Sequence, residues 1–220
     1  TIGDYYCYER EKLDFCKKNL PQLDDSFMGK IIALNETSKD FQIMSKGHRN
    51  SQGLFYDFEK DIIWSTDHGP EGGDEMNINS KPEESIKNYG WPIASYGNHY
   101  KGPGLKEKYA IAPLNKSHSD YNFKEPLKYF TPALGISQIV KVKGFLSENK
   151  DELFVGSLGF DLEEGDLSLH YFKLDSNNKI LKQNVISVRE RIRDIEYISD
   201  LNLIVLFLET SGSIAIIEKI

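Results

Sequence analysis

The sequence has 220 residues, enough for one large all-β domain or two small domains with a sizeable hydrophobic core. Its 34 acidic and 27 basic residues give a formal net charge of −7. This balance argues against a nucleic-acid-binding surface, which needs concentrated positive charge, and it suits a protein that holds a cation. No stretch of the sequence approaches the roughly 20 consecutive apolar residues of a membrane-spanning helix.

The beginning of the chain, "TIGDYY", has no methionine and no visible signal peptide, which is typical of a processed or truncated product. The two cysteines, Cys7 and Cys16, match neither a CxxC redox pair nor a set of zinc ligands. Two interpretations stay open for them. They are either two ordinary half-buried thiols or, in an exported protein, a local disulfide.

Short strands dominate the predicted secondary structure. Two helices are also expected: one over residues 9–18, and one over residues 81–88, where Pro82 suits a first turn. The strands are β-branched or aromatic runs bounded by Gly, Asn, Asp or Ser. They cover residues 29–35, 53–59, 61–67, 136–142, 151–158, 167–175, 184–188, 193–199, 201–209 and 212–220.

The spacing of these strands indicates how the chain is organised. From residue 136 onward, strand follows strand after connections of a few residues, roughly as in propeller blades of about 40 to 50 residues. Residues 95–130 differ, because they are rich in Gly, Pro, Lys and Tyr and show little periodicity. We interpret them as a long irregular excursion between blades, of the kind that often builds a site. No linker is visible, so we predict one domain over residues 1–220.

The stretch "HGPEGGDEMN", residues 68–77, has the composition of a calcium site. The Gly69-Pro70 pair leaves backbone carbonyls sterically open, and two further glycines permit a tight reversal. Asp74 and Glu75 then supply carboxylate oxygens. Ca²⁺ prefers six to eight such oxygen ligands in flexible geometry. The alternative, favoured when this stretch is taken alone, is a polar surface turn, with His68 as an ordinary structural histidine.

Two arginine-containing motifs indicate anion recognition. In "GHRN", Arg49 and Asn50 precede a strand and offer a planar fork and an amide. In "RIRD", period-two alternation places Arg191 and Arg193 on the same face of a strand, where they repel each other unless an anion lies between them. The alternative is that these two arginines pair with nearby acidic residues at positions 190, 194 or 196.

Several motifs together resemble the glucose/sorbosone dehydrogenase family, which comprises soluble aldose sugar dehydrogenases that use pyrroloquinoline quinone (PQQ). The resemblance runs from residue 1 almost to residue 220. It implies a six-bladed β-propeller, of which this chain supplies about four blades, and a periplasmic or secreted location. The motifs are "TIGD" (1–4), "GHRNSQGL" (47–54), "DHGPEGGDEMN" (67–77), "NYGWP" (88–92), "ELFVGSL" (152–158) and "RIRDI" (191–195).

The resemblance implies metal-binding roles for four residues. Gly69 and Pro70 match the pair whose backbone carbonyls hold a Ca²⁺ ion beneath PQQ. Glu75 and Tyr89 match ligands of a further structural Ca²⁺ site. The expected cofactors are therefore PQQ and Ca²⁺.

The resemblance also implies roles in cofactor binding for five residues. Arg49 and Asn50 match residues that line the quinone and substrate pocket. Arg191 and Arg193 match arginines that embrace the carboxylates of the cofactor, which would be the anion between the pair. Asp4 matches the aspartate that supports the catalytic histidine of the family.

Two departures from the family pattern carry expectations of their own. The catalytic histidine of the family lies upstream of the "TIGD" motif, so the general base is expected before Thr1, with about two further blades. The family's glucose dehydrogenase branch also carries a cofactor-binding lysine shortly after "VGSL", whereas residues 157–166 here are acidic and contain no lysine. An acidic loop would repel a tricarboxylate cofactor.

Two functions follow from these expectations. The first is PQQ- and Ca²⁺-dependent oxidation of aldose sugars, with an electron acceptor as partner. The second is a calcium-binding propeller that has lost the cofactor and serves as a binding or interaction module. An arc of about four blades would also leave sheet edges unpaired, so self-association or a partner chain that completes the propeller is expected.

Overall fold

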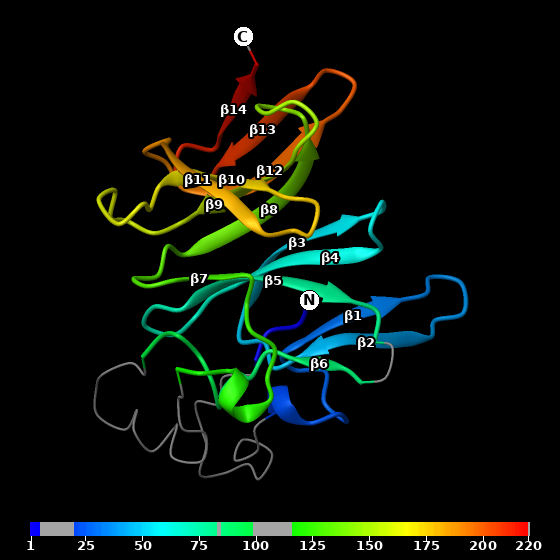
Figure 1. The fold of residues 1–220 in the computed structure, drawn as a ribbon. Helices are drawn as coiled ribbons and strands as arrows, with labels where there is room; N and C mark the ends of the chain where they lie inside the picture. The colour runs from blue at the N-terminus through cyan, green and yellow to red at the C-terminus, as the bar shows by residue number, and fades with distance from the viewer. Residues whose placement is uncertain (5–19, 83–84, 99–115, 220) are drawn as a thin grey trace. The chain divides into compact units, whose positions relative to one another are not determined.

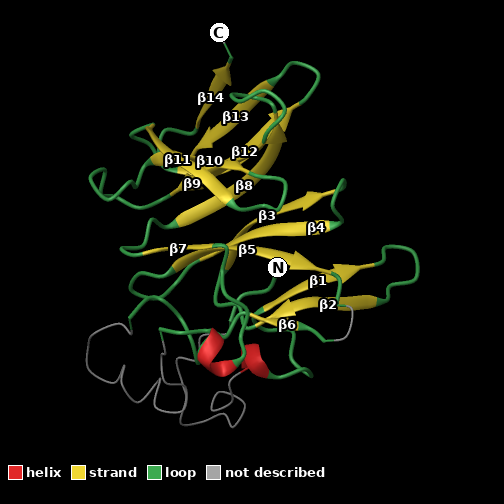
Figure 2. Cartoon of the chain, viewed as in Figure 1, coloured by secondary structure: helices red, strands yellow, loops and turns green. Residues whose placement is uncertain are grey.

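The computed structural model describes residues 1–4, 20–82, 85–98 and 116–219 (Figure 1). The predicted helix over residues 9–18, Cys7 and Cys16 lie outside these residues. Strands are the main regular structure of the described residues, drawn as yellow arrows in Figure 2, and two short 3-10 helices accompany them, η2 (Leu20–Gln22) and η3 (Ser119–Tyr121). None of the described helical segments is long and apolar enough to cross a membrane.

The chain is all-β, as the sequence predicts. The described strands are β1 (Lys30–Leu34), β2 (Phe41–Lys46), β3 (Ser51–Asp57), β4 (Ile62–Asp67), β5 (Asp74–Ser80), β6 (Lys87–Asn88), β7 (Lys128–Phe130), β8 (Ile136–Lys143), β9 (Asp151–Ser157), β10 (Ser168–Leu174), β11 (Ile180–Ser187), β12 (Ile192–Ile198), β13 (Leu203–Leu208) and β14 (Ser213–Glu218). Each of the ten predicted strands overlaps one of them.

The strands form four small sheets, which is the number expected for about four propeller blades. Their strand orders are β1-β2-β6, β3-β4-β5-β7, β11-β10-β9-β8 and β12-β13-β14. Most neighbouring pairs are antiparallel, such as β9 with β10 and β13 with β14, and the short pair β2–β6 is parallel.

The chain divides into two compact units. Unit 1 comprises residues Thr1–Ser51 and Asp67–Ala133, and unit 2 comprises residues Gln52–Thr66 and Leu134–Ile220. The prediction of one domain over residues 1–220 stays a prediction.

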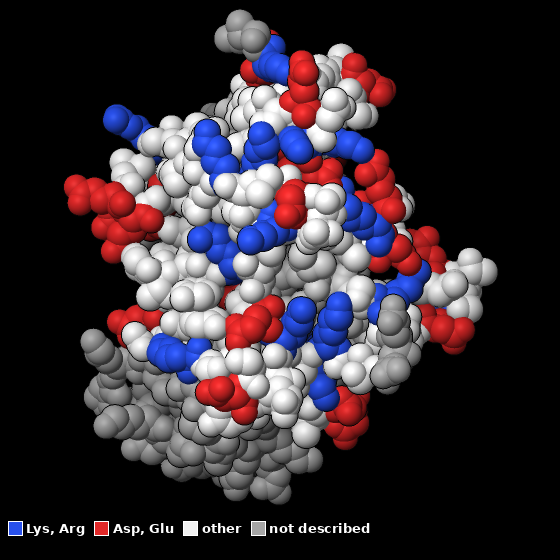
Figure 3. Space-filling model, viewed as in Figure 1, with Lys and Arg blue, Asp and Glu red and all other residues white. Residues whose placement is uncertain are grey.

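On the face shown in Figure 3, acidic and basic side chains are mixed, and neither sign forms a continuous field there.

The core of unit 2 follows from the alternation of side chains along β8 to β14. Phe154 on β9 lies opposite Tyr171 on β10, and both belong to one buried cluster with Ile195 and Leu206. Strand β9 is buried at every position except its first, as expected for a strand covered on both faces. This packing explains why the hydrophobic runs of the C-terminal half predict its strands well.

One predicted helix is wrong. Residues 87 and 88 of the predicted helix 81–88 form strand β6, which pairs with β2 through Ser45–Lys87 and Lys46–Asn88. The backbone N–H of Tyr89 then donates to the carbonyl of Lys46 at 2.8 Å. This pairing with a distant strand overrides the weak local preference for a helix.

The sequence also missed strand β5, because we interpreted Asp74 and Glu75 as part of an irregular turn. Instead, β5 pairs with β7, with Asp74 opposite Phe130 and Glu75 opposite Tyr129. Strand β7 lies inside the predicted excursion 95–130. The described residues of that excursion otherwise hold only η3 and a bridge between Asn98 and Glu71, and residues 99–115 lie outside the described part.

Candidate functional site

A small pocket lies within unit 1, where the two glycine-rich motifs and the segment around Trp91 meet. It has room for about one water-sized atom. Its walls combine charged, aromatic and small residues: Gly47, Arg49, Asp67, His68, Gly69, Gly73, Glu75, Tyr89, Trp91, Ala94 and Ser95.

The floor of the pocket is a turn that tolerates only glycine at several positions. Gly73 has φ +75°, a conformation that L side chains rarely adopt, and a Cβ there would collide with the backbone nitrogen of Gly97. A Cβ on Gly69 would collide with the carbonyl oxygen of Gly72. The backbone N–H of Gly69 donates to Asp74 Oδ1 at 3.0 Å and fixes the turn to the start of β5. The backbone itself therefore forms this wall of the pocket.

Asp67 holds the "GHRN" segment against the "DHGP" segment. Its carboxylate accepts the backbone N–H of Arg49 at 3.0 Å and that of Asn50 at 2.6 Å. Its Oδ2 also lies 3.4 Å from Nδ1 of His48, whose Nε2 lies 2.7 Å from Oγ of Ser45. His48 and Ser45 are fully buried, so this Ser–His–Asp row has no access for a substrate and braces the loop.

Arg49 reaches the pocket from this loop and lies over the ring of Trp91. Its Nη1 donates to the carbonyl of His68 at 3.2 Å, and its Cζ lies 5.5 Å from the centre of the Trp91 ring. The indole Nε1–H of Trp91 donates to Asp4 Oδ2 at 2.9 Å. Asp4 in turn donates its backbone N–H to the carbonyl of Arg49 at 2.6 Å.

Glu75 is a buried carboxylate that lines the pocket. Burial raises the pKa of its carboxyl, and the proximity of His118 opposes that rise only in part. Its Oε2 accepts Nδ2 of Asn77 at 3.3 Å, while Oδ1 of Asn77 has no hydrogen-bond partner among the described residues. A cation beside these oxygens would offset the cost of burying the carboxylate.

His118 and Tyr89 complete the surroundings of Glu75. Nε2 of His118 lies 3.5 Å from Oε1 of Glu75, and neither ring nitrogen of this fully buried histidine makes a hydrogen bond within the described structure. The Tyr89 hydroxyl donates to the carbonyl of Ile78 at 2.6 Å, and burial, together with the charge of Glu75, raises the pKa of its phenol.

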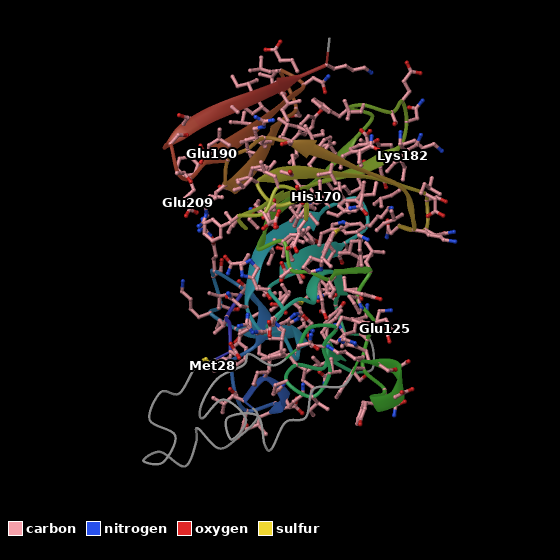
Figure 4. All side chains as sticks on the ribbon, turned by 90° about the vertical axis from the view of Figure 1, so that its left-hand side faces the viewer. Met28, Glu125, His170, Lys182, Glu190 and Glu209 are labelled. Carbon is pink, nitrogen blue, oxygen red and sulfur yellow. The ribbon has the colours of Figure 1, made fainter. Side chains whose placement is uncertain are left out.

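A separate cluster in unit 2 surrounds Arg191 and Arg193. Nη2 of Arg191 lies 3.4 Å from Oε1 of Glu209, and Arg193 pairs with Oε2 of the same carboxylate (Figure 4 labels Glu209). The guanidinium of Arg191 also lies 5.1 Å from the ring centre of Phe160, a residue that is 81% exposed. The anion between the two arginines is thus a carboxylate of the chain itself, at a position that the sequence reasoning did not consider.

The structure brings together some of the predicted site residues. Arg49, Gly69, Glu75 and Tyr89 all line the pocket. Asp4 contacts it through Trp91, and Pro70 is buried next to Gly69. Asn50 joins through its backbone, which donates to Asp67 and accepts from His68 N–H at 3.0 Å.

Arg191 and Arg193 belong to unit 2, and their role at the cofactor stays a prediction. In the part of the chain that the structure describes, no three His, Cys, Asp or Glu side chains are placed to hold a metal ion. A Ca²⁺ ion in this pocket would therefore depend on backbone carbonyls in addition to Glu75.

Sequence reasoning missed Asp67, Trp91 and His118 as site residues. Asp67 and Trp91 stand inside the motifs "DHGPEGGDEMN" and "NYGWP". Their membership in these motifs was the signal that could have identified them as site residues. No sequence signal pointed to His118, because its contact with Glu75 joins positions 43 residues apart, 118 − 75.

Comparison with known proteins gives the family. The family model described as "Glucose / Sorbosone dehydrogenase" matches residues 15–216. The chain belongs to the glucose/sorbosone dehydrogenase family.

Two curated relatives match over 208 residues each. The aldose sugar dehydrogenase YliI of Escherichia coli K12 is 30% identical over 86% of this chain and 51% of its own length. The uncharacterised protein slr1608 of Synechocystis is 31% identical over 88% of this chain and 46% of its own length. The chain thus spans about half the length of the curated relatives it matches.

Solved structures show the same fold. The soluble aldose sugar dehydrogenase of Escherichia coli in its apo form has a TM-score of 0.67 and 24% identity, covering 89% of this chain and 56% of that chain. A glucose dehydrogenase structure has a TM-score of 0.67 and 24% identity, covering 96% of this chain and 59% of that one. These likenesses confirm the predicted sugar dehydrogenase fold, present here in part.

Proposed function

We propose that the protein is a PQQ- and Ca²⁺-dependent dehydrogenase that oxidises aldose sugars. The observation that carries this proposal is the convergence of Arg49, Gly69, Glu75 and Tyr89 on one pocket in a chain of this family. An arginine fork, open backbone at a glycine turn and a buried carboxylate are the groups that an anionic cofactor and its cation require.

The residues present fit a calcium ion. Glu75 is almost fully buried, and burial raises the pKa of its carboxyl, so a divalent cation would compensate a charge that the protein leaves poorly compensated. Gly69 and Pro70 would offer carbonyls from a turn too crowded to carry a larger side chain at Gly69. Tyr89 lines the same pocket as Glu75 and would belong with it to the further structural Ca²⁺ site that the resemblance implies; its hydroxyl donates to Ile78. A Ca²⁺ ion at Gly69 and Pro70 would supply Lewis-acid polarisation of a quinone oxygen.

The residues of unit 1 also fit one end of an anionic quinone. The Arg49 guanidinium is held by the His68 carbonyl and the Trp91 ring, so it is oriented before any ligand arrives. Asp67 fixes the backbone of Arg49 and Asn50, and Asp4 supports Trp91. Bound PQQ supplies the two-electron oxidant. The role of the chain is to bind and orient the anionic ligand and to exclude bulk water from a narrow pocket.

The proposal assigns the general base to a histidine that the family resemblance places before Thr1. It also includes a periplasmic or secreted location and an electron acceptor that takes electrons from the reduced cofactor. For the 220-residue chain by itself, the proposal includes self-association or a partner chain that completes the propeller, because strand β14, at the edge of its sheet, has Ile214 and Ile216 67% and 57% exposed. A single monomeric species in light scattering would contradict self-association.

A second candidate function is a calcium-binding propeller without the cofactor. Glu209 favours it, because this carboxylate already pairs with both Arg191 and Arg193. The loop after β9 adds further negative charge through the exposed residues Asp161, Glu163 and Glu164. An anionic cofactor that used the two arginines would have to compete with Glu209 for them.

Dye-linked oxidation of a panel of aldoses by the full-length protein, with PQQ and Ca²⁺, tests the first function. The proposal predicts activity that needs both additions and falls on Arg49→Lys, since lysine cannot reproduce the planar fork. Arg189→Lys, at an exposed arginine, serves as the matched control. Binding of Ca²⁺ without oxidation of any aldose would favour the second function.

A further inference from the structure

Trp91 lies at the centre of the pocket wall, although neither the resemblance nor the comparisons give it a role. It is 5% exposed, and its ring lines the pocket together with Arg49. The guanidinium carbon of Arg49 lies 5.5 Å from the centre of the ring, within the range of a cation–π contact.

The orientation of the Trp91 ring is fixed from several sides. Its Nε1–H donates to Asp4 Oδ2 at 2.9 Å, which sets the direction of the indole edge. Its backbone N–H donates to Gly47 at 2.9 Å, and its carbonyl accepts Nε2 of Gln22 at 2.6 Å. The ring therefore presents one defined face to Arg49.

Asp4, Trp91 and Arg49 form a closed circuit of contacts. The backbone of Arg49 accepts from Asp4, the carboxylate of Asp4 accepts from Trp91, and the ring of Trp91 faces the guanidinium of Arg49. A long arginine side chain loses rotamer freedom on binding a ligand, and a side chain that is already fixed loses less. The circuit fixes Arg49 in advance.

We propose that Trp91 is a positioning residue that, held by Asp4, aims the Arg49 guanidinium into the pocket for an anionic ligand. The identity of that ligand as PQQ rests on the proposed function, whereas the positioning itself does not. The carboxylate of Asp4 acts on the site through the indole N–H. A phenylalanine at position 91 would keep a ring for Arg49 and would lose this link.

The positioning is tested first without any ligand. These 220 residues contain two tryptophans, so in protein labelled with 5-fluorotryptophan the variants Trp64→Phe and Trp91→Phe assign their two fluorine NMR signals. Asp4→Asn and Arg49→Lys should each shift the Trp91 signal and leave the Trp64 signal unchanged. Asp40→Asn, at an exposed aspartate, should shift neither. If neither Asp4→Asn nor Arg49→Lys shifts the Trp91 signal, the proposal is overturned. If Asp4→Asn does not fold, the result for Arg49→Lys alone decides.

The second test measures binding of PQQ in the presence of Ca²⁺. Asp4→Asn and Trp91→Phe should each weaken binding by at most about 30-fold, the effect of losing a whole cation–π contact, because both variants keep a ring for Arg49. The double variant should bind no more weakly than Trp91→Phe alone, because Asp4 acts through the indole N–H. Fully multiplicative losses would refute that coupling. A parent protein that binds no PQQ would end the proposed function, while the fluorine signals still decide the positioning.

Discussion

Two buried carboxylates, Asp57 in unit 2 and Glu75 in unit 1, are compensated in opposite ways. In unit 2, Nζ of the buried Lys141 lies 2.8 Å from Asp57 and 3.4 Å from Asp151, and Lys60 adds a second contact to Asp151 at 2.9 Å. In unit 1, the polar contacts of the buried Glu75 carboxylate within the described residues are the Asn77 amide at 3.3 Å and the His118 imidazole at 3.5 Å. A charge paired inside the fold becomes costly when its partner is removed, whereas a buried charge that the chain compensates poorly indicates a ligand.

The pKa directions express the same contrast. Burial raises the pKa of the Asp57 carboxyl, but the hydrogen bond and charge of Lys141 outweigh burial, so the pKa lies below its usual value. For Glu75, burial dominates and the pKa lies above its usual value. The fold thus compensates the charge of Asp57 by itself and leaves the charge of Glu75 poorly compensated.

The largest expected effect comes from breaking the complete site. Lys141→Met leaves Asp57 buried without its cation and should lower the free energy of unfolding by about 3–5 kcal/mol in urea titrations. Lys60→Met, at a lysine whose side chain is 27% exposed, is the matched control and should cost about 1 kcal/mol or less. Equal losses in the free energy of unfolding of the two variants would show that burial does not determine how much these ion pairs contribute to stability.

The pH dependence of the same variant has a defined sign. Because the folded pKa of Asp57 is depressed, its pairing stabilises the parent above the unfolded pKa near 4, and this stability is lost as the pH falls through the folded value. The difference in the free energy of unfolding between the parent and Lys141→Met should therefore shrink below about pH 4. A deficit that stays constant down to pH 2 would contradict this assignment.

The glycine floor should be the next most sensitive feature. Gly73→Ala combines φ +75° with a collision against Gly97, so it should cost about 2–5 kcal/mol in thermal or urea unfolding. Gly212→Ala has nearly the same backbone conformation, φ +65°, with no atom within 4 Å of the new Cβ, and should cost about 1–2 kcal/mol. Similar costs at both positions would mean that crowding does not define the pocket floor.

Glu75→Gln tests whether the buried charge of Glu75 serves a Ca²⁺ ion. With Ca²⁺ at a 100-fold excess over its dissociation constant, the parent should gain about 2.7 kcal/mol of stability. The Gln variant should gain little, yet without Ca²⁺ it should melt higher than the parent, because it buries no charge. Glu71→Gln, at an exposed neighbour, should behave as the parent. A Glu75→Gln variant that keeps the full Ca²⁺ response would remove Glu75 from the metal site.

Glu209→Gln should have the smallest effect on stability, within about 1 kcal/mol, because the pairs of Glu209 with Arg191 and Arg193 are partly exposed. If these arginines serve an anionic cofactor, the variant should bind PQQ more tightly, since it frees their charge. Weaker or unchanged PQQ binding would indicate that the arginine pair is structural.

The sequence predicted the strands of unit 2 well because hydrophobic runs such as residues 201–209 have only one way to be buried in a sheet. It failed at β5, whose inward-facing residues Glu75 and Asn77 are polar and therefore resemble a loop. The alternation with Met76 and Ile78 was the signal that could have revealed this strand.

The candidate site shows the same limit. The motifs indicated that Arg49 and Gly69 would meet, but periodicity carries no information about contacts between distant segments. The contacts of Glu75 with His118 and of Arg193 with Glu209 each depend on how separate strands and loops pack. Tertiary packing alone determines which charges are compensated.

The central claim is that the pocket of unit 1 holds a cation and that Arg49, on its wall, binds one end of an anionic quinone. Spectral titration of the full-length protein with PQQ, in the presence and absence of Ca²⁺, tests it most directly. The account predicts saturable binding that requires Ca²⁺ and is weakened by Arg49→Lys but not by Arg189→Lys. No spectral change with millimolar Ca²⁺, or binding that is indifferent to Arg49, would contradict it.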